Sequence, residues 1–264
     1  MKISVLGLGV VGNAVYTGFL QLGHTMSFYD PAKDSKFEDV LETEICFICV
    51  PTPPNDDGFC DTTIVEQSIK NLQDNNYDGI VVVKSTVVPG TTESLAKKYQ
   101  DLKIAFVPEF LRERCAVVDF IENHDLCVIG TDSDECYNKI KEAHGSYPRN
   151  FKKLSRTEAE LVKYYNNIYN ATLVTLANSF YEVCKNLNAS YTNVKNSLVL
   201  RDHINDSYLQ CNENFRGFGG VCLPKDTLAI AKLVEKSNID VQFFDTILKE
   251  NKKYKVTVYD GMRK

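Results

Sequence analysis

The chain has 264 residues, of which 44% are apolar and 25% charged, and its formal net charge is −5. This acidic balance argues against binding to nucleic acid or to an anionic membrane surface, because both need a basic face. No apolar run reaches the ~20 residues that cross a bilayer, and the N-terminus enters a strand pattern without a signal peptide, so we expect a soluble, cytoplasmic protein.

The first half of the chain alternates short apolar runs with amphipathic, helix-like stretches. Strands that alternate with helices are typical of a parallel sheet covered on both faces. Residues 1–150 are therefore predicted to form an α/β domain, a Rossmann-like doubly wound parallel sheet. The expected strands are Ile3–Leu6, Thr25–Tyr29, Ile45–Val50, Ile80–Val83, Ile104–Val107 and Leu126–Ile129, and the expected helices lie near 11–21, 62–73, 91–100 and 133–143.

The second half of the chain has a helical pattern. Ser155 and Glu158 form a capping-box signature that opens one long helix, 155–187. Residues 151–254 are predicted to form a central helical domain for substrate binding and dimerisation, built around this helix, and 255–264 a short tail with a strand-like run at 256–259. The long helix has more apolar surface than a small helical region covers, which predicts a homodimer packed through it. Shorter helices are expected near 190–201, 224–236 and 240–253, with a loop over 203–221.

The nine cysteines are an odd number, and several lie in strand-like apolar runs. Cys46 and Cys49 form a C-x-x-C pair, but residues three apart in a strand point to opposite faces and do not easily share a metal ion. Buried thiols are the favoured interpretation, and no disulfide framework is expected. The four histidines show no metal-ligand spacing, so no metal site is predicted.

A glycine-rich turn follows the first expected strand and opens the first helix: Gly7-Leu8-Gly9-Val10-Val11-Gly12. Such a turn lets the backbone approach a dinucleotide pyrophosphate, which then faces a helix N-terminus. Asp30, at the end of the second strand, suits a ribose diol and favours NAD over NADP, with Lys33 close by. Candidate cofactor loops follow two further strands, although each could be only a turn, and they contain Pro51, Thr52 and Thr86.

The run from Gly217 to Asp226 is the most informative stretch. Its glycines allow close approach of a ligand, and Pro224 fits the first turn of a helix. Cys222 would then lie at a helix N-terminus, where the macrodipole stabilises a thiolate, with Asp226 on the same helix face. A buried structural cysteine is the alternative interpretation.

These segments resemble the UDP-glucose/GDP-mannose dehydrogenase family. The family pattern G-F-G-G-x-C-[LF]-P-K-D is similar to 217–226, and P-E-F-L-R-E is similar to 108–113. Its K-S-T segment is matched at 84–86 and its A-E-x-x-K-x-x-x-N helix at 159–167. With the glycine turn, five matches occur in order along the chain.

The resemblance implies oxidation of the C6 alcohol of a UDP- or GDP-hexose to a carboxylate with two NAD, and UDP-glucose oxidised to UDP-glucuronate is the expected reaction. Cys222 would form a thiohemiacetal and then a thioester. Lys163 would stabilise the oxyanion with Asn167 beside it, while Asp226, Glu109 and Thr86 would handle protons and water. By the same resemblance Glu113 would border the cofactor, and the substrate would be held by Glu109, Phe110, Leu111, Lys163, Asn167 and Gly219.

The resemblance has departures. Family members commonly carry a third, C-terminal domain, so a short form without it is expected here, and Arg114 replaces a usual small residue. A fragment whose third domain is another chain, a β-hydroxyacid dehydrogenase of the 6-phosphogluconate type and a non-catalytic NAD-binding remnant are the alternatives. A β-hydroxyacid dehydrogenase has no use for a nucleophilic cysteine. A remnant need not keep all five chemical groups, which are those of Cys222, Lys163, Asn167, Glu109 and Asp226.

Overall fold

The computed structural model describes residues 1–257, which form two compact units. Unit 1 comprises Met1–Asn55 and Cys60–Lys163, and unit 2 comprises Asp56–Phe59 and the chain from Tyr164 onward. The predicted tail 255–264 lies mostly outside the described residues. Within the described part of the chain, no helix is long and apolar enough to cross a membrane.

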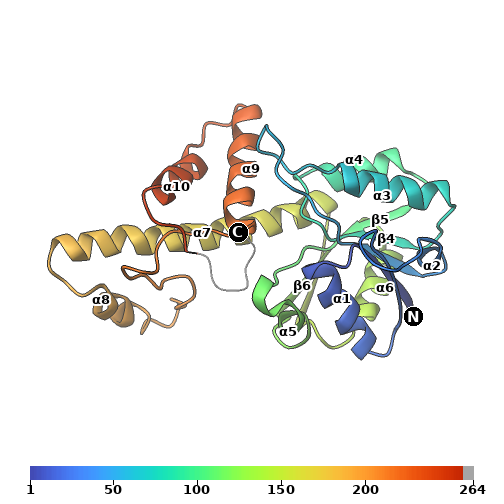
Figure 1. Ribbon diagram of the computed structural model, residues 1–264, viewed down its shortest axis with the longest axis horizontal. Coiled ribbons are helices and arrows are strands. Elements are labelled where there is room, and N and C mark those ends of the chain that lie inside the picture. The colour runs from blue at the N-terminus through green and yellow to red at the C-terminus, as the bar shows by residue number, and fades with distance from the viewer. Residues whose placement is uncertain (258–264) are drawn as a thin grey trace. The chain divides into compact units, whose positions relative to one another are not determined.

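Unit 1 contains a seven-stranded sheet (Figure 1), which confirms the predicted α/β class. The spatial order is β2-β1-β3-β4-β5-β6-β7, and neighbouring strands are parallel except β5 and β6, which are antiparallel. The strands are β1 (Lys2–Leu6), β2 (Thr25–Tyr29), β3 (Ile45–Ile48), β4 (Ile80–Val83), β5 (Lys103–Phe106), β6 (Leu126–Gly130) and β7 (Asn150–Leu154).

The sequence prediction omitted β7 and placed residues 151–154 in the helical domain. This strand reads Asn-Phe-Lys-Lys-Leu and lies at the edge of the sheet, where charged side chains face water and prevent further pairing. It therefore lacks the continuous apolar run that identifies a buried parallel strand.

Helices cover both faces of this sheet. One face packs against α1 (Val10–Gln21), α5 (Ala116–Ile121) and α6 (Asp134–His144), and the other against α2 (Glu38–Leu41), α3 (Thr63–Asp74) and α4 (Thr91–Lys98). The side chains of β3 alternate between the two cores, as strand geometry requires. Cys46 is buried in one core, whereas Cys49 packs against the other, so the predicted opposite orientation of these thiols is confirmed.

Unit 2 is helical. The long helix α7 (Arg156–Asn186) begins in unit 1 and continues through unit 2. Its predicted capping box is present, since the Ser155 amide donates to the Glu158 carboxylate at 2.9 Å and the Glu158 amide donates to the Ser155 hydroxyl at 3.3 Å. The other helices are α8 (Tyr191–Leu198), α9 (Cys222–Lys236) and α10 (Phe243–Asn251). Helix α9 begins two residues earlier than predicted, so Cys222 itself is its first residue.

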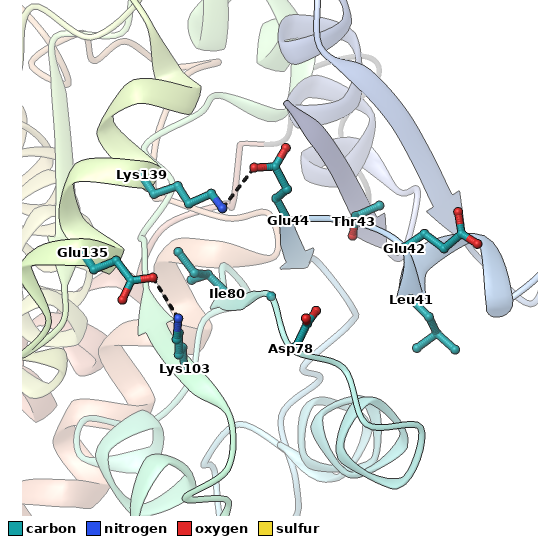
Figure 2. Close-up of a pocket in the computed structure, with 10 residues that line it drawn as sticks. Leu41, Glu42, Thr43, Glu44, Asp78, Ile80, Lys103, Glu135 and Lys139 are labelled. Carbon is teal, nitrogen blue, oxygen red and sulfur yellow. Dashed lines mark hydrogen bonds and ion pairs between the residues drawn. The ribbon is translucent and has the colours of Figure 1, made fainter.

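A surface pocket of about 290 Å³ opens where β3, β4 and β5 begin (Figure 2). Glu44, Ile80 and Lys103 line it at these strand starts, and the ion pairs Lys139–Glu44 (3.0 Å) and Lys103–Glu135 (2.8 Å) cross it. Ligands of doubly wound sheets bind beyond the opposite, carboxyl ends of the strands. This pocket is therefore at the wrong edge for a dinucleotide.

The close approach of α1 to β1 can be tested at two glycines. A Cβ at Gly12 would lie 1.9 Å from the carbonyl oxygen of Gly7, whereas a Cβ at Gly9 would have no neighbour within 4 Å. We expect Gly12→Ala to lower the free energy of unfolding by about 1–3 kcal/mol, although Gly→Ala within a helix ordinarily raises it. Gly9→Ala is the matched control, and equal stability of the two variants in chemical denaturation would contradict this packing.

Candidate active site

The glycine turn lies between β1 and α1 and is held by its neighbours. Gly7 has a φ of +86°, and a Cβ there would meet the Cys49 carbonyl oxygen at 2.8 Å, so only glycine fits. Val10 and Val11 are the first residues of α1, whose N-terminal amides and dipole are suited to an anion. The turn thus forms a cradle that fits a pyrophosphate.

Asp30 lies at the end of β2 and binds the glycine turn directly. Its carboxylate accepts hydrogen bonds from the backbone amides of Leu8 at 2.7 Å and Ala32 at 2.9 Å. Lys33 is exposed in the turn that follows. The structure therefore gives Asp30 a role that the sequence prediction missed, which is to fix the shape of the glycine turn; ribose binding stays a prediction.

The two other predicted cofactor loops start side by side. The Ser85 hydroxyl donates to the carbonyl oxygen of Val50 at 2.6 Å, which joins the loop after β4 to the loop after β3. Pro51 and Thr52 follow directly, and Thr86 is half-buried beyond Ser85. The structure therefore brings these loops to the same edge of the sheet as the glycine turn.

The next loop along this edge carries a buried ion pair. The Lys163 ammonium donates to both the carboxylate and the backbone carbonyl of Glu109, each at 2.7 Å, and the two side chains are 5% and 10% exposed. The backbone amide of Leu111 donates to the other carboxylate oxygen at 2.7 Å. Burial opposes ionisation, but Lys163 and these hydrogen bonds hold the pKa of Glu109 below its usual value, so Glu109 is a carboxylate at neutral pH.

A second lysine, Lys84, forms hydrogen bonds with the backbone just before Glu109. Lys84 is 3% exposed, and its ammonium donates to the carbonyl oxygens of Pro108 at 3.3 Å and Val107 at 3.5 Å. Burial lowers the pKa of this lysine. The K-S-T segment thus anchors the backbone just before Glu109.

The rest of the 108–113 segment is fixed by Asp119, which the sequence analysis did not single out. The Asp119 carboxylate accepts from the backbone amide and from two guanidinium nitrogens of Arg112, at 2.6–2.9 Å, and from Asn123 at 3.1 Å. Burial opposes ionisation of Asp119, but these donors hold its pKa well below the usual range. Glu113 is half-buried in the short 3-10 helix Glu113–Cys115, which begins right after Arg112.

Phe110 and Leu111 are half-buried in the same loop. The Lys163 ammonium lies 6.0 Å from the centre of the Phe110 ring, within the range of a cation–π contact. Contact of these two residues with a substrate stays a prediction.

Unit 2 contains a second cluster. Asp226 is fully buried, and its carboxylate accepts from the Asn167 amide at 2.6 Å and from the Lys225 ammonium at 2.7 Å. Asn167 comes from α7 and the other two from the first turns of α9. The structure therefore joins the predicted Asn167 and Asp226, and it adds Lys225 as a partner that the prediction did not name.

Cys222, the first residue of α9, is the one cysteine of nine with an exposed side chain. The others are buried or half-buried, and burial raises the pKa of Cys46 and Cys127 to about 12. Gly219 is half-buried in the preceding loop. Position and exposure are those of a reactive thiol rather than of a core thiol.

Within residues 1–257, no group of three His, Cys, Asp or Glu side chains is placed to hold a metal ion.

The buried pair gives a direct test. Lys163→Met leaves the Glu109 carboxylate buried without its ammonium, so we expect a loss of about 3–5 kcal/mol in the free energy of unfolding. Lys70→Met, which removes an exposed ion pair with Asp74, should cost about 0–1 kcal/mol. Lys163→Met combined with Glu109→Gln should cost less than the sum of the single changes; additive losses in denaturation curves would exclude a coupled pair.

The sequence of this chain is similar to proteins of one known family. Residues 32–147 match the NAD binding domain of the UDP-glucose/GDP-mannose dehydrogenase family, and residues 157–253 match its central domain. The UDP-glucose 6-dehydrogenase AglM of Haloferax volcanii is 30% identical and covers 87% of this chain. The UDP-glucose 6-dehydrogenase TuaD of Bacillus subtilis is 27% identical and covers 99%. The chain spans 64% and 65% of the lengths of these two relatives.

Solved structures agree. A UDP-glucose dehydrogenase from Pyrobaculum islandicum aligns with a TM-score of 0.85 and 30% identity over 96% of this chain and 68% of that one. A 3-hydroxyisobutyrate dehydrogenase from Mycobacterium tuberculosis shares the fold, with a TM-score of 0.73 at 12% identity. The sequence matches and the structural likeness together show that this chain belongs to the UDP-glucose/GDP-mannose dehydrogenase family and contains its NAD-binding domain.

Proposed function

We propose that this chain is an NAD-dependent nucleotide-sugar dehydrogenase that oxidises UDP-glucose to UDP-glucuronate. The observation that carries the proposal is Cys222, an exposed thiol at the first turn of α9 in a chain whose other cysteines are buried or half-buried. A thiolate in this position is a good nucleophile for a carbonyl carbon. The relatives named above are UDP-glucose 6-dehydrogenases, which supports UDP-glucose as the sugar.

The cofactor site of the proposal is the carboxyl edge of the sheet in unit 1. The turn from Gly7 to Gly12 would receive the pyrophosphate at the start of α1, and Asp30 would face the ribose. Pro51, Thr52 and Thr86 begin the neighbouring loops, and Glu113 would border the cofactor. Bound NAD would supply the hydride acceptor for both oxidations.

The proposed reaction has four steps. The C6 alcohol loses a hydride and a proton and becomes an aldehyde, and the Cys222 thiolate then adds to its carbonyl carbon to give a thiohemiacetal. Loss of a second hydride and a proton converts this to a thioester. Water adds to the thioester, and the thiolate leaves, so that one carboxylate forms while two NAD are reduced.

The predicted polar groups of the two clusters have these roles in the scheme. Lys163 would stabilise the negative oxygen that develops when the thiolate adds, and Asn167, one turn further along α7, would donate a hydrogen bond to the same region. Glu109, held as a carboxylate, would accept a proton from the attacking water with the help of Thr86. Asp226 would take part in proton transfer, and Phe110, Leu111 and Gly219 would hold the sugar.

A β-hydroxyacid dehydrogenase and a non-catalytic remnant are the two alternatives to this proposal. The β-hydroxyacid dehydrogenases share the fold, as the likeness at 12% identity illustrates, but their chemistry needs no nucleophilic cysteine. A non-catalytic NAD-binding remnant would have no need of Cys222, Lys163 and Asp226 together. The retained set of groups favours catalysis.

The proposal is tested by turnover. We expect the protein to reduce two NAD for each UDP-glucose consumed, measured as NADH absorbance against UDP-glucuronate formed. Cys222→Ser should abolish production of the acid, and Cys184→Ser, at a buried thiol near the end of α7, should leave it unchanged. NAD binding without turnover of UDP-glucose, GDP-mannose or UDP-N-acetylmannosamine would instead indicate a remnant.

We also propose a homodimer through α7. Large apolar side chains that are 47–78% exposed follow one face of this helix at spacings of three, four and seven residues, and the last of them lies just beyond its end: Tyr165, Tyr169, Leu176, Phe180, Val183 and Leu187. An exposed apolar stripe of this length is typical of an interface.

We propose a cytoplasmic location as well. The nine cysteines are all free thiols, which is typical of proteins in a reducing compartment.

Light scattering tests the dimer. The wild-type chain should have twice the protomer mass, and Tyr169→Glu combined with Phe180→Glu should halve it, because two charges would have to be buried in the apolar interface. Asn186→Glu is the control, since this exposed residue of α7 lies outside the stripe. A monomeric wild type at micromolar concentration would contradict the proposal.

A further inference from the structure

The loop that precedes Cys222 is held by a side chain from far along the chain. Asn251, the last residue of α10, is 8% exposed, and its amide pairs with both backbone groups of Phe218: the Phe218 amide donates to Oδ1 at 2.8 Å, and Nδ2 donates to the Phe218 carbonyl at 2.9 Å. An asparagine that satisfies both groups replaces a neighbouring strand. The loop backbone is therefore fixed at Phe218.

Gly217 makes room for this contact. A Cβ at this position would lie 2.8 Å from Oδ1 of Asn251. The segment beyond α10 extends the attachment, because the Thr257 hydroxyl accepts from the Arg216 amide at 2.8 Å and the Thr257 amide donates to the Gly217 carbonyl at 3.0 Å. Residues 216–218 are thus bonded along their whole length.

Arg216 closes the attachment from α7. Its guanidinium lies between the rings of Tyr181 and Tyr254, at 4.6 and 4.7 Å from their centres, and donates to Asn178 at 2.8 Å. The Arg216 side chain is 10% exposed, so these contacts are mostly shielded from water. Side chains from α7, from the end of α10 and from the segment after α10 therefore all contact residues 216–218.

Between this anchor and Cys222 lie only Gly219, Gly220 and Val221. Gly220 has a φ of +73°, and two adjacent glycines give the chain wide conformational freedom. Cys222 begins α9, and Phe218 packs in the same hydrophobic cluster as Leu223 and Ile230 of that helix. Where Phe218 is held therefore also determines how the first turn of α9, with Cys222, is placed. We propose that Asn251 is the positioning residue of the Cys222 loop.

This inference rests on the proposed function for its catalytic consequence, but thiol chemistry tests it without a substrate. In Asn251→Ala, we expect the pH midpoint of Cys222 alkylation by iodoacetamide, followed by peptide mass spectrometry, to rise by about 0.5 pH unit, because the first turn of α9 would unwind once the loop is released and the thiol would lose the stabilising helix dipole. With UDP-glucose and NAD, kcat should fall about 10-fold to 100-fold while KM changes little.

Ile247→Val is the matched control. This residue is buried in the same helix and in the same hydrophobic cluster as Phe218, so its truncation loosens the packing and lowers stability while the hydrogen bonds between Asn251 and Phe218 stay in place. Thr257→Val, which removes the hydroxyl contacts with Arg216, should show a smaller change of the same kind and carries the test if Asn251→Ala does not fold. The alkylation midpoint should not move in Ile247→Val.

Two outcomes overturn the inference. One is an unchanged alkylation midpoint in both Asn251→Ala and Thr257→Val, and the other is a shift that Ile247→Val reproduces at equal loss of Tm. A wild-type protein that turns over no nucleotide sugar defeats the proposed function instead, and the alkylation midpoints still decide the role of Asn251.

Discussion

Parallel strands must end at the same edge of their sheet, and the unit 1 half of the candidate site depends on this constraint. The loops after β1, β3, β4 and β5 supply, in order, the glycine turn, Val50–Thr52, Ser85–Thr86 and Glu109. Each loop contacts the next. Gly7 packs against Cys49, Ser85 donates a hydrogen bond to Val50, and Lys84 donates to the backbone before Glu109. A dinucleotide and its reacting partner need such a continuous edge.

The charges along this edge are compensated by protein groups rather than by solvent. Lys84 and Lys163 both approach the segment that carries Glu109, and only one of them, Lys163, bonds to the carboxylate itself. Burial lowers the pKa of Lys84, which bonds only to backbone carbonyls here, whereas Lys163 forms an ion pair with the Glu109 carboxylate. A buried ammonium group such as that of Lys163 is suited to a reaction in which negative charge develops on oxygen.

The sequence was sufficient for features that depend on local pattern. The glycine turn, the long helix with its capping box and the opposite orientation of Cys46 and Cys49 follow from spacing alone, and all three are present. Features that depend on distant partners were missed. The amide of Asn251 reaches Phe218 across 33 residues, and nothing in its neighbourhood marks it, while the antiparallel pairing of β5 with β6 depends on how two half-sheets meet.

That pairing divides the sheet of unit 1 mechanically. Along β1 to β5, and again between β6 and β7, the strands bond through several successive residues, but β5 and β6 pair only at Phe106 and Gly130. Side chains add cohesion across this line: the guanidinium of Arg156, the first residue of α7 and two residues after β7, donates to the carbonyl oxygen of Ile104 in β5 at 2.8 Å. The sheet therefore has a seam, along which it would open first on partial unfolding, and the seam leaves the strands that end in the cofactor loops bonded together as one slab.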